Sequence, residues 1–263
     1  MINGDNASSV LVQTDLKDGY AIITMNRPEK RNALNRAARR GLLEAFERAE
    51  AAGARVVILT GTDKSFCSGI DIVERQNDEA NGVASDPGSD WIEIVMAIRQ
   101  HPAIFIAAVN GGAMGGGAAL ISVSDLALAS EVAWISNPEM GFGAFPHFSG
   151  PATQYQLQPK RAAWLIYTTE RIDGHTAEAW GLINECVATD ELLPRAEALA
   201  AKIAAFDPIA LTESKRALDA TLGLERDWRS AFKQGIEVNT RIRGRSPKSQ
   251  LTSAVARMTK ENT

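Results

Sequence analysis

A glycine-rich turn is the feature of this sequence that most directly suggests chemistry. In residues 107–122, AAVNGGAMGGGAALIS, an apolar strand pattern runs into glycines and then into a helix of small residues. The first N–H groups of a helix have no partner inside the helix, and the helix dipole adds partial positive charge there. The turn could therefore hold an oxygen that gains negative charge during a reaction. Close helix packing through the glycines is the alternative if this stretch is taken alone.

A similar turn follows an earlier strand of the sequence. Residues 56–72, VVILTGTDKSFCSGIDI, combine an apolar strand with a turn that contains glycine. Two such turns could supply two converging N–H groups. A dinucleotide site is excluded at the turn in residues 107–122, because none of Gly111, Gly112 and Gly115 starts a G-x-G-x-x-G pattern. A phosphate loop is excluded as well, since no Gly-Lys-Ser or Gly-Lys-Thr follows.

The elements that must position these turns alternate along the chain. Runs of β-branched residues predict strands, and apolar residues at helical spacing predict helices between them. The expected strands are at 21–25, 55–60, 104–109 and 125–129. The expected helices are at 35–52, 91–100 and 115–122. This alternation predicts an α/β core.

Two segments stand apart from this alternation. Residues 74–90, ERQNDEANGVASDPGSD, are polar and contain two glycines and a proline, so we expect a mobile surface loop. Beyond about Pro194 the strand patterns stop, and helices are expected at 193–205 and 208–222. We therefore expect a core with the site at 1–193 and a C-terminal helical region at 194–263.

Composition excludes several classes of function. The net charge of −4 argues against a general nucleic-acid surface. No apolar run approaches the ~20 residues that span a bilayer, and the first residues lack the pattern of a signal peptide. We expect a cytoplasmic protein without a membrane partner. Cys67, Cys186 and the three histidines fall at no metal-ligand spacing, so neither a metal nor a disulfide is expected.

Four motifs resemble those of the crotonase (enoyl-CoA hydratase/isomerase) family, and together they cover nearly the whole chain. FCSGID matches its F-[SCA]-[AS]-G-x-D element, and AVNGGAMGGG matches its A-x-N-G-x-A-x-G-G-G element. NRPEKRNAL matches its early CoA-binding element, and residues 170–187 match a further common stretch. The resemblance implies a crotonase-type spiral of repeated ββα units with a C-terminal helical oligomerisation region. It also implies a homotrimer or homohexamer, an acyl-CoA substrate and no separate cofactor, because coenzyme A belongs to the substrate.

The resemblance also assigns expected site residues. The backbone N–H groups of Ile70 and Gly116 would form an oxyanion hole for the thioester carbonyl, and Glu139 would transfer protons. Residues that would contact coenzyme A are Lys30, Arg31, Ala33, Ser68, Asp71 and Ile72. For Lys30 and Arg31, plain surface charge is the alternative explanation.

The chain departs from the family's hydratases at two positions. Those enzymes carry two glutamates, but Ala119 occupies the first position and only Glu139 is retained, which resembles the family's double-bond isomerases. His147 stands where hydratases usually have glycine. An imidazole could do acid or base work near neutral pH. The alternative is that His147 packs between Phe145 and Phe148 and is held by a backbone hydrogen bond.

These features favour an acyl-CoA-processing enzyme in which Glu139 transfers protons with help from His147. Isomerisation of an enoyl-CoA is the first expectation, and hydration through Glu139 and a water held by His147 is the second. A crotonase-type hydrolase or carbon–carbon lyase centred on His147 is a third. A non-catalytic acyl-CoA-binding protein is the alternative from another class, and the retained glutamate favours an enzyme over it.

Overall fold

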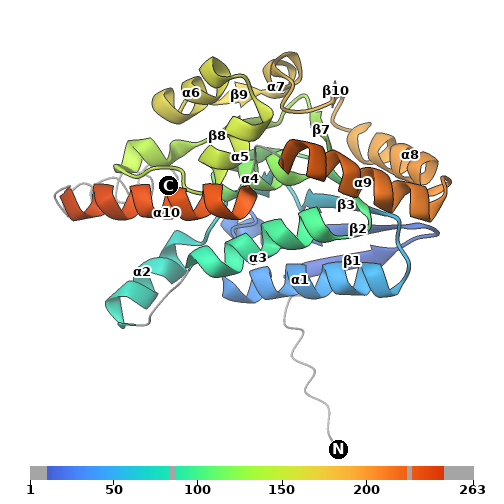
Figure 1. Ribbon diagram of the computed structural model, residues 1–263, viewed down its shortest axis with the longest axis horizontal. Helices are drawn as coiled ribbons and strands as arrows, with labels where there is room; N and C mark the ends of the chain where they lie inside the picture. The colour runs from blue at the N-terminus through green and yellow to red at the C-terminus, as the bar shows by residue number, and fades with distance from the viewer. Residues whose placement is uncertain (1–10, 83–86, 224–226, 246–263) are drawn as a thin grey trace, which may run out of the picture.

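The computed structural model describes residues 11–82, 87–223 and 227–245, and these form a mixed α/β structure with two sheets (Figure 1). The larger sheet has the strand order β1-β2-β3-β5-β7-β10. Its strands are β1 (Val12–Leu16), β2 (Tyr20–Met25), β3 (Val56–Gly61), β5 (Ile104–Val109), β7 (Leu126–Ser130) and β10 (Glu185–Val187). The smaller sheet consists, in spatial order, of β4 (Ser65–Cys67), β6 (Gly112–Met114), β8 (Trp134–Ser136) and β9 (Ile172–Asp173).

The chain alternates between the two sheets as it advances. The consecutive strand pairs β3–β4, β5–β6 and β7–β8 each give one strand to the larger sheet and one to the smaller. Within each sheet the successive strands of these pairs lie parallel. Each pair is followed by helical structure, so the chain winds as a spiral of ββα units. The structure confirms the expected α/β class and this repeat.

Helices pack around the two sheets, and the expected ones are present to within a few residues at each end. The helices before the second glycine turn are η1 (Pro28–Lys30), α1 (Arg36–Ala51), α2 (Ile72–Ala80) and α3 (Pro87–Gln100). Those that follow are α4 (Gly116–Val123), η2 (Pro138–Phe142), α5 (Ser149–Gln156), α6 (Pro159–Thr168), α7 (Gly174–Trp180), α8 (Leu192–Ala204), α9 (Pro208–Gly223) and α10 (Trp228–Arg245).

The central strands β3, β5 and β7 of the larger sheet are buried on both faces, which explains why their sequences are nearly continuous apolar runs. On one face lies the main core, to which α1 contributes Leu42 and Phe46, spaced one turn apart. Figure 1 shows α1 and α3 together on this side. On the other face α8 packs Ala196 and Ala200 against Ile58 and its neighbours. This two-sided burial fixes the strand ends from which the glycine turns start.

The expectation of a mobile loop at 74–90 is wrong for most of that segment. Residues 72–80 form α2 and residues 87–90 begin α3, while 83–86 lie outside the described residues. The Asp71 side chain caps α2 by accepting hydrogen bonds from the N–H groups of Val73 and Glu74. An ion pair of 2.9 Å between Arg36 and Asp78 then ties α2 to α1. A helix with few apolar residues is thus stabilised by its cap and its charges.

None of the helices in the described part of the chain is both long enough and apolar enough to cross a membrane.

Candidate active site

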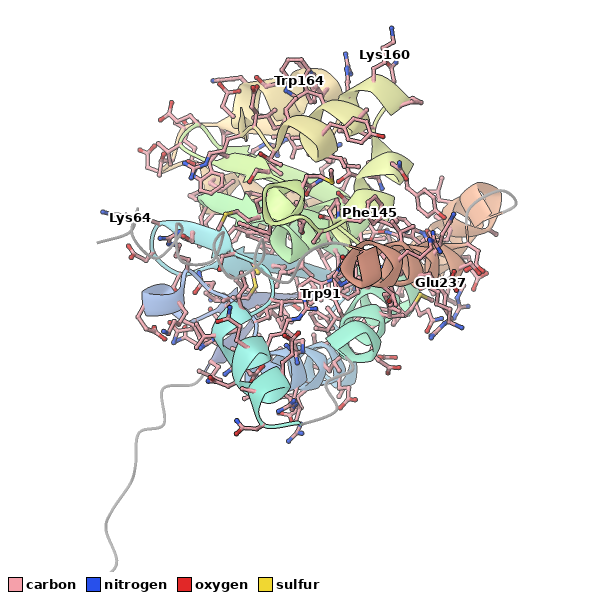
Figure 2. All side chains as sticks on the ribbon, turned by 90° about the vertical axis from the view of Figure 1, so that its left-hand side faces the viewer. Lys64, Trp91, Phe145, Lys160, Trp164 and Glu237 are labelled. Carbon is pink, nitrogen blue, oxygen red and sulfur yellow. The ribbon has the colours of Figure 1, made fainter. Side chains whose placement is uncertain are left out.

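A cavity of about 400 Å³ lies where the glycine turns meet η2, α2 and α10. Figure 2 looks onto this side of the molecule and shows Phe145 and Trp91 beside α10, on which Glu237 is labelled. All ten residues that the sequence nominated line the cavity. They are Lys30, Arg31, Ala33, Ser68, Ile70, Asp71, Ile72, Gly116, Glu139 and His147.

The two glycine turns are in direct contact. The first contains Gly69, and the second contains Gly115 and Gly116. Gly69 has a φ of +86°, and a Cβ atom added there would lie 2.9 Å from the backbone nitrogen of Gly116. A Cβ atom added at Gly116 would lie 2.6 Å from the Trp91 ring. Such distances are too short for any side chain. The approach therefore requires glycine at both positions, and it brings the N–H groups of Ile70 and Gly116 to the same wall of the cavity.

Backbone pairing sets the direction of the Ile70 N–H group. Leu34 donates to the Gly69 carbonyl at 2.8 Å, and Asp71 donates to the Leu34 carbonyl at 3.3 Å. These two hydrogen bonds form a parallel β-bridge in which Leu34 bonds to the residues on either side of Ile70. The N–H group of Ile70 therefore points away from Leu34. Gly116 is the first residue of α4, so its N–H group has no partner within the helix. Among the described residues, neither group donates a hydrogen bond to the protein.

Glu139 lies in η2 beside the second turn. A Cβ atom added at Gly115 would lie 2.6 Å from Oε1 of Glu139, so the carboxylate rests against the glycine backbone. The Ser149 hydroxyl donates to Oε1 at 3.4 Å. Oε2 is buried and has no hydrogen-bond partner in the described part of the chain. Burial raises the pKa of Glu139 from 4.5 to about 7, and this carboxyl group can both take and give a proton near neutral pH.

His147 combines packing with polar contacts. Its ring centroid lies 4.1 Å from that of Phe148, so the packing alternative is realised in part. Its Nδ1 lies 3.4 Å from the Phe145 carbonyl oxygen, which is the backbone contact that this alternative includes. Nδ1 also lies 3.2 Å from Nδ2 of Asn239, a contact that the alternative does not include. The ring lines the same cavity as Glu139.

Asn239 is a cavity residue that the sequence did not reveal. It lies on α10, which the motifs do not reach, and it is buried. Asn239 reaches the cavity because α10 packs tightly against His147. The expected C-terminal helices ended at residue 222, and even a helical pattern at α10 would not predict which partner that helix faces.

The residues expected to contact coenzyme A lie at the mouth and edge of the cavity. Lys30 and Arg31 are exposed and are adjacent to the first glycine turn, because the Ser68 hydroxyl donates to the Lys30 carbonyl at 3.2 Å. Ile72 is 40% exposed and lies at the start of α2, while Ala33 is buried. Two cations and an apolar edge at one opening can receive an anionic ligand with a long flexible arm.

Asp71 lines the cavity, yet both of its oxygens already have partners in the protein. Oδ2 lies 3.0 Å from Nη2 of Arg27 in an ion pair with little exposure. Oδ1 caps α2. Arg27 in turn donates to the Ala33 carbonyl. The contribution of Asp71 that this geometry supports is to hold the turn that carries Ile70.

Ala119 lies within α4 and is completely buried. A methyl group neither takes nor gives a proton, so the described residues provide no carboxylate on this helix. Glu139 is accordingly the carboxylate that lies against the glycine turns.

Comparisons with known proteins agree with this geometry. The family described as Enoyl-CoA hydratase/isomerase matches residues 15–244. A Bacillus subtilis protein named as an enoyl-CoA hydratase/isomerase, YngF, is 35% identical over 241 residues, which cover 85% of this chain and 89% of that protein. The crotonyl-CoA hydratase of Syntrophomonas wolfei is 35% identical over 217 residues, which cover 80% of this chain and 81% of that enzyme.

Solved structures agree with the fold as well. The crystal structure of an enoyl-CoA hydratase/isomerase from Xanthobacter autotrophicus superimposes with a TM-score of 0.83 at 29% identity, covering 94% of this chain and 96% of that one. The fold, the cavity and the family match lead to one identification: this chain belongs to the crotonase, or enoyl-CoA hydratase/isomerase, family.

Proposed function

We propose that this protein moves the double bond of an enoyl-CoA thioester, with Glu139 as the proton carrier. The observation that carries the proposal is the position of the Glu139 carboxylate against Gly115, next to the two glycine turns, with a buried Oε2 and a pKa raised to about 7 by burial. The completely buried Ala119 supports a mechanism with one carboxylate in place of two.

The proposed reaction needs no group from outside the protein and substrate. The thioester oxygen accepts hydrogen bonds from the N–H groups of Ile70 and Gly116. Glu139 takes a proton from the γ-carbon of an α,β-enoyl thioester, or from the α-carbon of a β,γ-enoyl thioester, and the electron pair is delocalised onto the thioester oxygen. The same carboxyl group then returns a proton to the other carbon. The product has the mass of the substrate.

Hydration is the second candidate, and the names of relatives favour it. The relative from Clostridium acetobutylicum, 33% identical over 221 residues, is named a short-chain-enoyl-CoA hydratase. In this reaction Glu139 would take a proton from a water molecule whose oxygen adds to the β-carbon, and it would then give a proton to the α-carbon. His147 would help to hold the water. The two polar side chains line one cavity, which supports the arrangement.

One assay separates the two candidates. The protein is incubated with a β,γ-enoyl-CoA and with its α,β-isomer, and the products are followed by mass spectrometry. Isomerisation interconverts the two substrates without a change in mass. Conversion of the α,β-enoyl-CoA alone, with the gain of one water, would replace the isomerase proposal by the hydratase. Thioester cleavage would indicate a hydrolase.

We also propose that the protein assembles as a homotrimer or homohexamer. Large apolar side chains are exposed away from the cavity, such as Trp164 (49%) and Tyr167 (75%) on α6 and Ile209 (72%) on α9. Figure 2 shows Trp164 at the outer edge of the molecule, far from Phe145. Contact with other copies would cover such groups. Light scattering that returns a 28.3 kDa monomer would contradict this proposal.

A further inference from the structure

The C-terminal helix α10 adds a polar side chain to the wall of the cavity. Asn239 lies on α10, lines the cavity and is 6% exposed. Its Nδ2 lies 3.2 Å from Nδ1 of His147. Backbone packing fixes this contact, because a Cβ atom added at Gly235 would lie 2.6 Å from the His147 carbonyl oxygen. His147 and Asn239 therefore form a pair whose members come from two tightly packed segments.

The Asn239 carboxamide is only partly used within the protein. Its Oδ1 is buried and has no hydrogen-bond partner among residues 11–82, 87–223 and 227–245. A buried carbonyl oxygen without a partner is unfavourable, and a bound molecule that donates a hydrogen bond removes this cost. Because the residue lines the cavity, the missing donor can come from a ligand.

The surroundings of the pair are apolar. Phe142, Ala144 and Phe145 line the same cavity, and the Phe148 ring packs on the imidazole. A hydrocarbon chain would pack against these side chains, but it would exclude water and leave the Asn239 oxygen unpaired. A hydroxyl group would donate to that oxygen, and it would equally accept from the amide N–H groups if the carboxamide turned over.

We propose, building on the acyl-CoA function proposed above, that His147 and Asn239 select an acyl group that carries a hydroxyl over a plain hydrocarbon chain. The proposed function assigns the thioester oxygen to Ile70 and Gly116, and the reacting carbons to Glu139. His147 and Asn239 would then contact the part of the acyl group that lies beyond the reacting carbons. A site built to hydrogen-bond a substrate hydroxyl rejects the analogue that lacks it, because its own polar groups are left unpaired.

Calorimetric titration with two unreactive saturated thioesters tests this selection without any turnover. The ligands are butanoyl-CoA and its derivative with a hydroxyl on the terminal carbon. The unmodified protein should bind the hydroxylated ester at least about tenfold more tightly. Asn239→Leu should reduce this ratio to about one without weakening the binding of butanoyl-CoA, because the variant has no oxygen to leave unpaired. Thr240→Val, at the exposed neighbouring position of α10, should keep the original ratio.

Two outcomes would overturn the selection. One is equal affinity of the unmodified protein for both esters, and the other is an equal weakening of both by Asn239→Leu, which a merely structural role would produce. Asn239→Ser, which removes the carboxamide with less bulk, replaces the leucine variant if that variant does not fold. A preference for the hydroxylated ester without turnover of any enoyl-CoA would overturn only the proposed function, and failure to bind either ester would overturn both.

Discussion

The two halves of the cavity are built in different ways. One half consists of the glycine turns, where a Cβ atom added at Gly69 would lie 2.9 Å from the Gly116 backbone nitrogen and one added at Gly116 would lie 2.6 Å from the Trp91 ring. The other half consists of side chains from η2, the loop after it and α10. It leaves two buried polar atoms without partners in the described part of the chain, Oε2 of Glu139 and Oδ1 of Asn239.

This difference separates two tasks. The backbone half offers N–H groups whose direction depends on strand pairing and helix geometry, so it can serve any substrate with a thioester carbonyl. The side-chain half contains Glu139, which the chain shares with the family's hydratases, and His147, which stands where they usually have glycine. In the proposed function, this half determines which proton moves and which acyl group fits. Changes in each half should have distinct consequences.

The largest effect is expected in the side-chain half at Glu139. Glu139→Gln keeps the shape of the side chain and removes the base. We expect kcat on enoyl-CoA substrates to fall by about 10² to 10⁴, with nearly unchanged binding of the thioester. Steady-state kinetics and calorimetry measure the two quantities. Glu79→Gln, which changes an exposed carboxylate at the edge of the same cavity, is the control and should keep full activity.

The backbone half should be sensitive to a single methyl group. In Gly116→Ala the added Cβ atom would lie 2.6 Å from the Trp91 ring, so the turn must shift and its N–H group loses its direction. We expect kcat to fall by about 10² to 10³, the usual cost of one lost donor in an oxyanion hole.

Gly141→Ala is the matched control for this change. Gly141 lies in η2, close to the site, but an added Cβ atom there meets nothing within 4 Å. Its activity should be close to that of the unmodified protein. A large loss in both variants would show that the region tolerates no substitution, and the distinction between the two halves would lose its basis.

Much of the fold could be predicted because its strands carry local signals. The β5 run at 104–109 is apolar on both faces and was expected with the observed ends. Strands of three residues, such as β4 and β8, were not expected, since a period of two cannot be recognised in so few residues. The helix α2 was missed because it has few apolar residues and is stabilised in part by the ion pair between Arg36 and Asp78, which is not local in sequence. The Asp71 cap is local, but a single capping residue does not predict a helix without an apolar pattern behind it.

The candidate site, like the fold, could be predicted from the sequence only in part. The nominated residues line one cavity because their motifs encode backbone geometry. Asn239 was not predicted, since its role depends on how closely α10 packs at Gly235 against residue 147, a contact between distant parts of the chain. The unpaired Oε2 of Glu139 is likewise a property of three-dimensional packing.

The pH dependence of kcat/KM also tests the assignment of Glu139, and we expect it to change activity less than the two substitutions do. Burial raises its pKa to about 7, so the base form is lost below that pH. We expect kcat/KM to fall about tenfold for each pH unit below this value and to level off above it. The same inflection should be missing from the residual activity of Glu139→Gln.

The contribution of Glu139 to the free energy of unfolding should fall as the pH rises, whereas activity should increase. The folded-state pKa of Glu139 is raised from 4.5, so its favourable contribution is complete below about pH 4.5 and is lost as the pH rises through about 7. Urea unfolding should therefore show that Glu139→Gln gains stability relative to the unmodified protein between these pH values. A constant difference across this range would contradict the raised pKa.

The smallest effect is expected at His147, and its size tests which residue leads the chemistry. The imidazole packs on Phe148 and contacts Asn239, so a positioning and recognition role fits its surroundings better than a direct attack. We expect His147→Ala to lower kcat/KM on a plain enoyl-CoA by about tenfold or less, below the cost of losing a general base. Because Glu139 remains in place, the pH inflection near its pKa of about 7 should persist in this variant. If His147→Ala abolishes turnover while Glu139→Gln keeps it, the proton carrier is the histidine, and a hydrolase or carbon–carbon lyase centred on His147 replaces the isomerase.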